Sequence, residues 1–376
     1  MNFTELAAYI DSLPGLGVPG CDLVVYRDHK QIFRHMAGWR DARRTQPMRG
    51  DEVYWIYSCT KVFTSCAAMQ LIGQGKLNLD DPVSRYIPAY ADLTVKDGDS
   101  VRPASRVMTV RHLMSMQSGL SYELKTPAMD ELLERTGGNA STRQLMEAKA
   151  KDPLEFEPGT DFLYSLSHDV LAVVIEAVSG MRFSEYLKKN IFDPLGLTTV
   201  GFRLTEETKK RMCAPFVCDG EGNFVHAPED ENNYRMSPDY ESGGAGLLSD
   251  VKDYITFVDT LACNGVSRQG VRILSPEMIQ LWSANQLAAK SRQTFDQWNR
   301  KGYSYALGVR TRVEADLGGK GQVGEFGWDG AASAWNMVDP VNHVSAYFAM
   351  HVRNYGYSYD VIHPKIRDLI YRGLEA

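Results

Sequence analysis

The sequence lacks the features that mark membrane proteins, nucleic-acid-binding proteins and disulfide-rich proteins. In its 376 residues no apolar run approaches the roughly 20 residues that span a bilayer. Asp and Glu number 47 against 41 Lys and Arg, so there is no basic excess to bind nucleic acid. The six cysteines form no C-x-x-C pair, and residues 1–5 contain no basic segment leading into an apolar one. We therefore expect reduced thiols, a cytoplasmic location, and neither membrane nor nucleic-acid partners.

Several common enzyme motifs are also missing. No G-x-S-x-G is present, which removes the nucleophile elbow of an α/β-hydrolase. The eight histidines form no H-x-H or H-E-x-x-H pattern, so the sequence predicts no metal site. Residues 15–20 match G-x-G-x-x-G, but they precede the first predicted strand and contain Pro19. A loop is the better interpretation, and no cofactor is expected.

What is present is a globular composition with strands at both ends of the chain. The residues are 44% apolar and 23% charged, which allows a large core. Residues 21–26 and 31–37 read as a hairpin, and residues 52–57 as a strand that runs into a helix ending at Gly75. Further helices are expected at 109–116, 141–150, 170–180, 250–262, 276–282 and 361–372, and strands at 303–313, 322–328, 331–338 and 344–352.

This order predicts a mixed α/β protein of the α+β type. Strands from both termini would form one antiparallel sheet flanked by helices, and a mostly helical region would be inserted between them. We place the sheet domain at residues 1–78 and 241–376 and the inserted helical domain at 79–240.

The first candidate for chemistry is Ser58-Cys-Thr-Lys61, where a strand turns into a helix. Residues three apart on a helix share a face, so the lysine would lie one turn behind the serine hydroxyl. A buried lysine with a lowered pKa can act as base toward such a hydroxyl. As a bare pattern, S-x-x-K is also consistent with a helix cap and a solvated lysine.

Two further segments add to this candidate. Tyr164-Ser165 precedes a predicted buried helix, where a phenol could move a proton, although a core tyrosine is the commoner explanation. Residues 327–332, Gly-Trp-Asp-Gly-Ala-Ala, lie between two predicted strands. Small residues there allow close approach to a ligand, and a strand N–H can serve in an oxyanion hole; an Asp329-Gly330 hairpin turn is the alternative.

Taken together, these motifs resemble the serine β-lactamase and penicillin-recognising superfamily. The resemblance is greatest to the class C β-lactamase-like branch, which includes family VIII carboxylesterases. It covers nearly the whole chain, and its clearest stretches are residues 58–75, 76–82, 109–114, 118–120, 157–160, 164–165, 191–197 and 243–247. It implies a β-lactamase/transpeptidase-like fold and a serine hydrolase that works through an acyl-enzyme.

The resemblance also implies residue roles. Ser58 would be the acylated nucleophile, and Lys61 and Tyr164 would share the proton network that activates it. The backbone N–H groups of Ser58 and Ala331 would form the oxyanion hole. Residues 328–330 would occupy the position of the family's lysine-threonine-glycine motif, next to the substrate.

Two departures from the family pattern bear on the substrate. Trp328 and Asp329 stand where a cation usually holds a substrate carboxylate, so we expect Asp329 to repel such a group. Leu166 replaces an amide side chain that is common in class C enzymes. Both changes favour neutral acyl substrates. Tyr122, Trp328, Trp55 and Tyr57 are candidates for an aromatic acyl pocket, unless they are scattered core residues.

The leading hypothesis is therefore a cofactor-free carboxylesterase or acyltransferase acting on a small acyl substrate. A D-amino acid peptidase or amidase, or a weak β-lactamase, is the second hypothesis. The third is a penicillin-binding-like sensor that is acylated without turnover. The sequence gives no indication of the physiological substrate or the oligomeric state.

Overall fold

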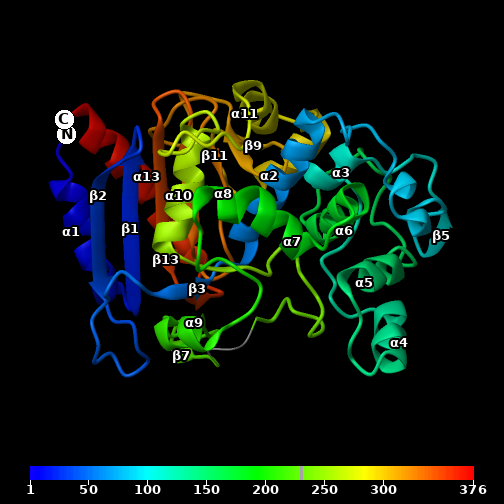
Figure 1. The fold of residues 1–376 in the computed structure, drawn as a ribbon, viewed down its shortest axis with the longest axis horizontal. Helices are drawn as coiled ribbons and strands as arrows, with labels where there is room; N and C mark the ends of the chain where they lie inside the picture. The colour runs from blue at the N-terminus through cyan, green and yellow to red at the C-terminus, as the bar shows by residue number, and fades with distance from the viewer. Residues whose placement is uncertain (229–231) are drawn as a thin grey trace.

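The computed structural model describes residues 1–228 and 232–376, and a seven-stranded sheet lies at its centre (Figure 1). In spatial order its strands are β2 Lys30–Gly38, β1 Gly20–Arg27, β13 Val344–Met350, β12 Trp335–Asp339, β11 Phe326–Gly327, β10 Arg310–Arg312 and β9 Tyr303–Tyr305. β1 and β13 come from opposite ends of the chain and pair antiparallel, with Cys21 opposite Met350. The predicted antiparallel sheet built from both termini is confirmed.

Alternation along the strands explains how both faces of the sheet are covered. Leu23 and Val25 of β1 pack in one cluster with helices α1 Thr4–Ser12 and α13 His363–Glu375. The intervening Val24 joins a second cluster, which includes helix α10 Val251–Ala262. Because successive strand residues point to opposite faces, one run of apolar residues serves both layers.

The larger core cluster extends from α10 into a helical region at the other end of the molecule from α1 (Figure 1). Its central helices, α2 Thr60–Gly73 and α6 Ser167–Ser179, pack against each other. The remaining α-helices are α3 Val110–Met114, α4 Pro127–Arg135, α5 Thr142–Lys149, α7 Phe183–Leu187, α8 Asp193–Leu195, α9 Glu206–Arg211, α11 Pro276–Ser283 and α12 Ala289–Asp296. Short 3₁₀ and π turns occur at Leu13–Leu16, Tyr57–Cys59, Val83–Arg85, Pro88–Tyr90, Lys188–Phe192 and Ser358–Ile362.

Short strand pairs connect these layers. β3 Val53–Trp55 pairs with β8 Leu248–Asp250, which brings two distant segments to the start of α2. The other pairs are β4 Thr94–Asp97 with β5 Ser100–Pro103, β6 Phe216–Cys218 with β7 Phe224–His226, and β6 with β14 Val352–Arg353. The parallel β6–β14 pair ties the middle of the chain to its C-terminal part.

The C-terminal strands are shorter than the sequence predicts. The single strand expected at 303–313 is wrong, because Gly308 adopts φ +92° and the chain reverses between β9 and β10. The strand expected at 322–328 is reduced to Phe326–Gly327. The strand expected at 331–338 begins only at Trp335, since Ser333 has φ +68° and the Gly330 N–H donates to the Ala334 carbonyl at 2.8 Å.

All six cysteines are free. In the part of the chain that the structure describes, no helix has both the length and the apolar character needed to cross a membrane.

The Gly308 turn gives a stability prediction. A Cβ at Gly308 would collide with Ser65 Oγ of α2 and His168 Nε2 of α6, both of which are buried. We expect Gly308→Ala to lower the free energy of unfolding by about 2–4 kcal/mol, from overpacking plus left-handed strain. Gly75 has a similar φ of +69° but nothing within 4 Å of the added atom, so Gly75→Ala should cost about 1 kcal/mol. Urea denaturation measures both, and equal losses would contradict the packing argument.

Candidate active site

Ser58 lies at the junction between strand β3 and helix α2. Pairing of β3 with β8 fixes the incoming chain, and the Ile56 N–H also donates to the Leu247 carbonyl at 3.0 Å. Tyr57 then adopts φ +44°, a left-handed conformation that is strained for a bulky residue. This turn places Ser58 ahead of the first turn of α2, with 8% of its surface exposed.

Lys61 lies one turn further along, and its side chain is fully buried. Its ammonium donates to Ser58 Oγ at 3.2 Å and to the Gly244 carbonyl at 2.8 Å, and lies 3.5 Å from the Tyr122 hydroxyl. Burial disfavours the charged form and lowers the pKa of Lys61 to about 7, although nearby Asp169 opposes the shift. The lysine can therefore change its protonation state near neutral pH while in contact with the serine.

Tyr164, in the segment that precedes α6, lies close to Lys61 and Ser58. Its ring lies 4.5 Å from Lys61 Nζ, and its hydroxyl accepts a hydrogen bond from Trp328 Nε1 at 2.9 Å. Tyr122 stacks on Tyr164 with ring centroids 5.5 Å apart. Burial raises the pKa of both phenols, while a hydrogen bond with Ser58 acts in the opposite direction on each. The three predicted catalytic side chains, Ser58, Lys61 and Tyr164, are thus brought together, and both phenols remain neutral near pH 7.

A cavity of about 410 Å³ opens over Ser58. Aromatic side chains dominate its wall, and the lining residues are Ser58, Tyr122, Tyr164, Tyr234, Trp298, Arg300, Trp328, Asp329, Gly330, Ala331, Gly356, Tyr359 and Asp360. Of the four rings expected in an aromatic pocket, Tyr122 and Trp328 line it. Trp55 and Tyr57 pack in a separate core cluster instead. Sequence reasoning missed Tyr234, Trp298 and Tyr359, because nothing local to them indicates a shared cavity.

The remaining predicted site residues divide into two groups. Trp328, Asp329, Gly330 and Ala331 all line the Ser58 cavity, although Ala331 lies in the 330–334 turn and not in the strand expected there. Leu166 is 2% exposed and packs in the core, so it is not among the residues described as lining the cavity. The structure does not bring it together with the other predicted site residues, because the start of α6 turns it inward.

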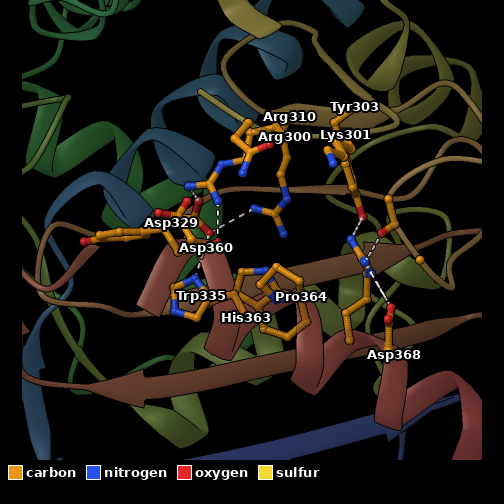
Figure 2. A pocket seen from close by; sticks show the side chains of 15 residues that line it. Arg300, Lys301, Tyr303, Arg310, Asp329, Trp335, Asp360, His363, Pro364 and Asp368 are labelled. Atoms are coloured by element: carbon orange, nitrogen blue, oxygen red, sulfur yellow. Dashed lines mark hydrogen bonds and ion pairs between the residues drawn. The ribbon is translucent and has the colours of Figure 1, made fainter. Parts of the chain in front are cut away.

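The Asp329 carboxylate is largely buried and is held by two arginines (Figure 2). Arg300 lies 3.1 Å from one oxygen and Arg310 lies 3.3 Å from the other, with His363 Nδ1 at 3.5 Å. Burial would raise the pKa of Asp329, but Arg310 and Arg300 outweigh it and hold that pKa below its usual range. The charges of Arg300 and Arg310 therefore offset the repulsion that Asp329 was expected to exert on a substrate carboxylate. Arg300 itself lines the cavity.

Asp169 is a neighbour of Lys61 whose role sequence reasoning missed. Its fully buried carboxylate accepts hydrogen bonds from Tyr240 at 2.7 Å and from Ser242 Oγ at 2.6 Å. Burial raises the pKa of Asp169, and the Lys61 charge lowers it. The sequence feature that could have indicated this role is the position of Asp169, an acidic residue in the first turn of the mostly apolar helix α6. Through these hydrogen bonds Asp169 holds the 240–244 segment, whose Gly244 carbonyl accepts a hydrogen bond from Lys61.

In the described chain one group of three potential metal ligands occurs, His29, Asp259 and Cys263, and these residues lie outside the Ser58 cavity. The chemistry that the Ser58 cavity can support from its own side chains is nucleophilic attack by a hydroxyl beside a buried amine.

Comparison with known proteins identifies the family of the chain. The model of the Beta-lactamase family matches residues 6–366. An uncharacterised protein of Mycobacterium tuberculosis is 29% identical over 333 residues, covering 85% of this chain and 82% of the relative. Esterase EstB of Burkholderia gladioli is 28% identical over 292 residues, covering 70% of this chain and 72% of the esterase.

The solved structures agree as well. EstCE1, described as a hydrolase with promiscuous acyltransferase activity, superposes with a TM-score of 0.81 at 24% identity and covers 98% of both chains. This likeness confirms the predicted fold, and the family match over nearly the whole chain confirms the resemblance seen in the sequence. The chain belongs to the Beta-lactamase family and has its β-lactamase/transpeptidase-like fold.

Proposed function

We propose that the protein is a serine hydrolase that forms an acyl-enzyme on Ser58, and that it acts as a carboxylesterase or acyltransferase on neutral acyl substrates. The observation that carries this proposal is the 3.2 Å contact between Ser58 Oγ and the buried amine of Lys61, at the base of an aromatic cavity. A hydroxyl beside an amine that can be neutral at pH 7 is an activated nucleophile.

Acylation proceeds in two steps. Neutral Lys61 takes the proton of Ser58 as its oxygen bonds to the substrate carbonyl carbon, and the carbonyl oxygen becomes an oxyanion. The backbone N–H groups of Ser58 and Ala331, both on the cavity wall, stabilise this charge. The bond to the leaving alkoxide then breaks, and the alkoxide takes a proton from the Tyr164 phenol, which Lys61 replenishes.

Deacylation reverses these roles. Water or an alcohol gives its proton to Lys61 while its oxygen attacks the acyl carbon, and the ester bond to Ser58 breaks with return of the proton to Oγ. Hydrolysis and acyl transfer therefore differ only in the acceptor. The aromatic walls favour an apolar acyl group or acceptor, and EstB and EstCE1 carry names consistent with either outcome.

The second candidate is a peptidase or β-lactamase acting on a substrate that bears a carboxylate. Arg300 on the cavity wall favours it, because a guanidinium binds carboxylates well. Against it, Arg300 already bonds to Asp329 Oδ2 at 3.1 Å and to the Tyr359 carbonyl at 2.6 Å. A neutral substrate is therefore better supported than one that bears a carboxylate.

The direct test of the acyl-enzyme is Ser58→Ala. We expect hydrolysis of a p-nitrophenyl ester to fall by at least roughly 10⁴-fold, because the nucleophile is lost. Ser100→Ala, at an exposed serine, is the matched control and should leave the rate unchanged. Mass spectrometry after rapid quenching should find the acyl group on wild type and not on Ser58→Ala. Near-normal turnover by Ser58→Ala would refute the proposal, and an adduct that never hydrolyses would favour a sensor.

The pH profile tests the lysine. If Lys61 must be neutral, kcat/KM rises through about pH 7, the pKa that burial gives it. The Asp169 charge raises that pKa, so Asp169→Asn should lower it further and move the acidic limb to lower pH. Asp253→Asn, at a buried aspartate that binds the backbone N–H of Thr199, should leave the midpoint in place. A pH-stat assay measures all three, and a limb that stays fixed in Asp169→Asn would contradict the role of Lys61 as base.

A substrate panel separates the two candidates. We expect kcat/KM on short neutral esters to exceed that on nitrocefin and D-alanyl peptides, because Arg300 is engaged by Asp329. Arg300→Gln should lower the rate on carboxylate-bearing substrates by roughly tenfold, the value of one charged hydrogen bond, and change ester rates little. Lys301→Gln, next in the chain and outside the Ser58 cavity, is the control. Fastest turnover of nitrocefin would overturn the preference for neutral substrates.

A further inference from the structure

Three side chains that can bind metals meet at the C-terminal end of helix α10. The other end of this helix approaches the candidate active site, where Tyr254 donates to the Cys59 carbonyl at 3.0 Å. The three side chains are His29, Asp259 and Cys263, and one ligand atom of each lies within 4.8 Å of the others. His29 Nδ1 lies 2.7 Å from Asp259 Oδ2. His29 and Asp259 are 230 residues apart in the chain, which is why no histidine motif in the sequence indicates the cluster.

Local structure brings the three residues together. Asp28 and His29 form the tight turn between β1 and β2, with φ of +48° and +62°. Such turns favour Asn-Gly, so a histidine at the second position is unusual and costs some backbone strain. Asp259 and Cys263 lie four residues apart at the end of α10, and hence on one side of the helix.

Burial of the cluster is uneven. The Asp259 side chain is 6% exposed and that of His29 is 25% exposed, so the imidazole side leaves access to solvent. The cluster therefore holds a poorly solvated carboxylate beside a thiol, two groups for which a divalent cation would be a favourable partner. Ser345 Oγ, 3.5 Å from the other Asp259 oxygen, can orient that carboxylate.

We propose that His29, Asp259 and Cys263 form a metal site that takes Zn²⁺, with water as the fourth ligand. One nitrogen, one oxygen and one sulfur donor suit zinc, whereas calcium and magnesium take oxygen ligands. A tetrahedral zinc centre separates its donor atoms by roughly 3.3–3.8 Å, so His29 Nδ1 and Asp259 Oδ2 would move apart slightly to admit the ion. Binding releases the thiol proton of Cys263 to solvent, and a neutral His29 that binds through Nδ1 carries its ring proton on Nε2.

The consequence is structural. Zinc would clamp the β1–β2 turn to the end of α10, and α10 packs on β1, β12 and β13. None of the three ligands lines the Ser58 cavity, so the site is independent of the proposed acyl chemistry.

The test is metal titration of the full chain after chelator treatment, with Zn²⁺ in competition with a chromophoric chelator. We expect one equivalent to bind, and Co²⁺ in its place should give a thiolate-to-cobalt charge-transfer band. Cys263→Ser and His29→Asn should each weaken binding by at least roughly the 10–100-fold that loss of an outer-shell partner causes. Asn is chosen because it tolerates the left-handed turn position. Cys218→Ser, at the other partly exposed cysteine, is the control and should bind as wild type does.

Two further readouts keep the result unambiguous. Zinc should raise the Tm of wild type and of Ser58→Ala equally, and should not raise that of Cys263→Ser. Since Ser58→Ala removes the proposed catalysis, its unchanged zinc binding separates this site from the function of the cavity. Unchanged affinity in Cys263→Ser, or a cobalt complex without the thiolate band, would overturn the proposal and leave a plain His29–Asp259 ion pair.

Discussion

The candidate active site is built around one buried amine. A lysine with no solvent contact would ordinarily be a liability, because removing an ammonium from water is costly. Here Lys61 is fully buried, and the cost of burying its charge lowers its pKa. A lysine with a lowered pKa can be neutral and accept a proton. The Ser58 hydroxyl, the Gly244 carbonyl and the Tyr122 phenol satisfy the amine without supplying a full negative charge. Asp169 stays near enough to moderate the shift.

The rest of the architecture keeps that amine dry and in place. α2 is buried along nearly its whole length and packs against α6, α7 and α11. The strained Tyr57 turn and the β3–β8 pair fix the entry to the helix. The Asp169 carboxylate near the lysine accepts hydrogen bonds from Tyr240 and Ser242. The β3–β8 pair and these hydrogen bonds join segments that are far apart in the chain, so the site forms only when the whole fold does.

Electrostatics around the cavity follow a second constraint. Asp329 lies beside the Ser58 cavity, and its charge is compensated by Arg300 and Arg310 (Figure 2). The result is a buried ion-pair network beside an aromatic cavity, with one arginine on the wall. The charge next to the cavity is therefore set by the network as a whole, and not by Asp329 alone.

The sequence by itself determined the local elements and the identity of the main candidate site residues. The apolar, β-rich residues 21–26 and the turn after them predicted the first hairpin, Ser141 or Thr142 predicted the start of α5, and the S-x-x-K spacing predicted a serine and lysine on one helix face. These are properties of neighbouring residues, and strand and helix periodicities express them directly.

Tertiary structure alone decided the rest. It placed Tyr122 and Tyr164 over the lysine, turned Leu166 into the core, surrounded Asp329 with arginines, and gathered Tyr234, Trp298 and Tyr359 around one cavity. It also split the expected strand at Gly308, where close approach to Ser65 and His168 leaves no space for a side chain. In each case the outcome depends on the distance between groups that are remote in the sequence, or on the dielectric around them. Both are set only when the chain has packed.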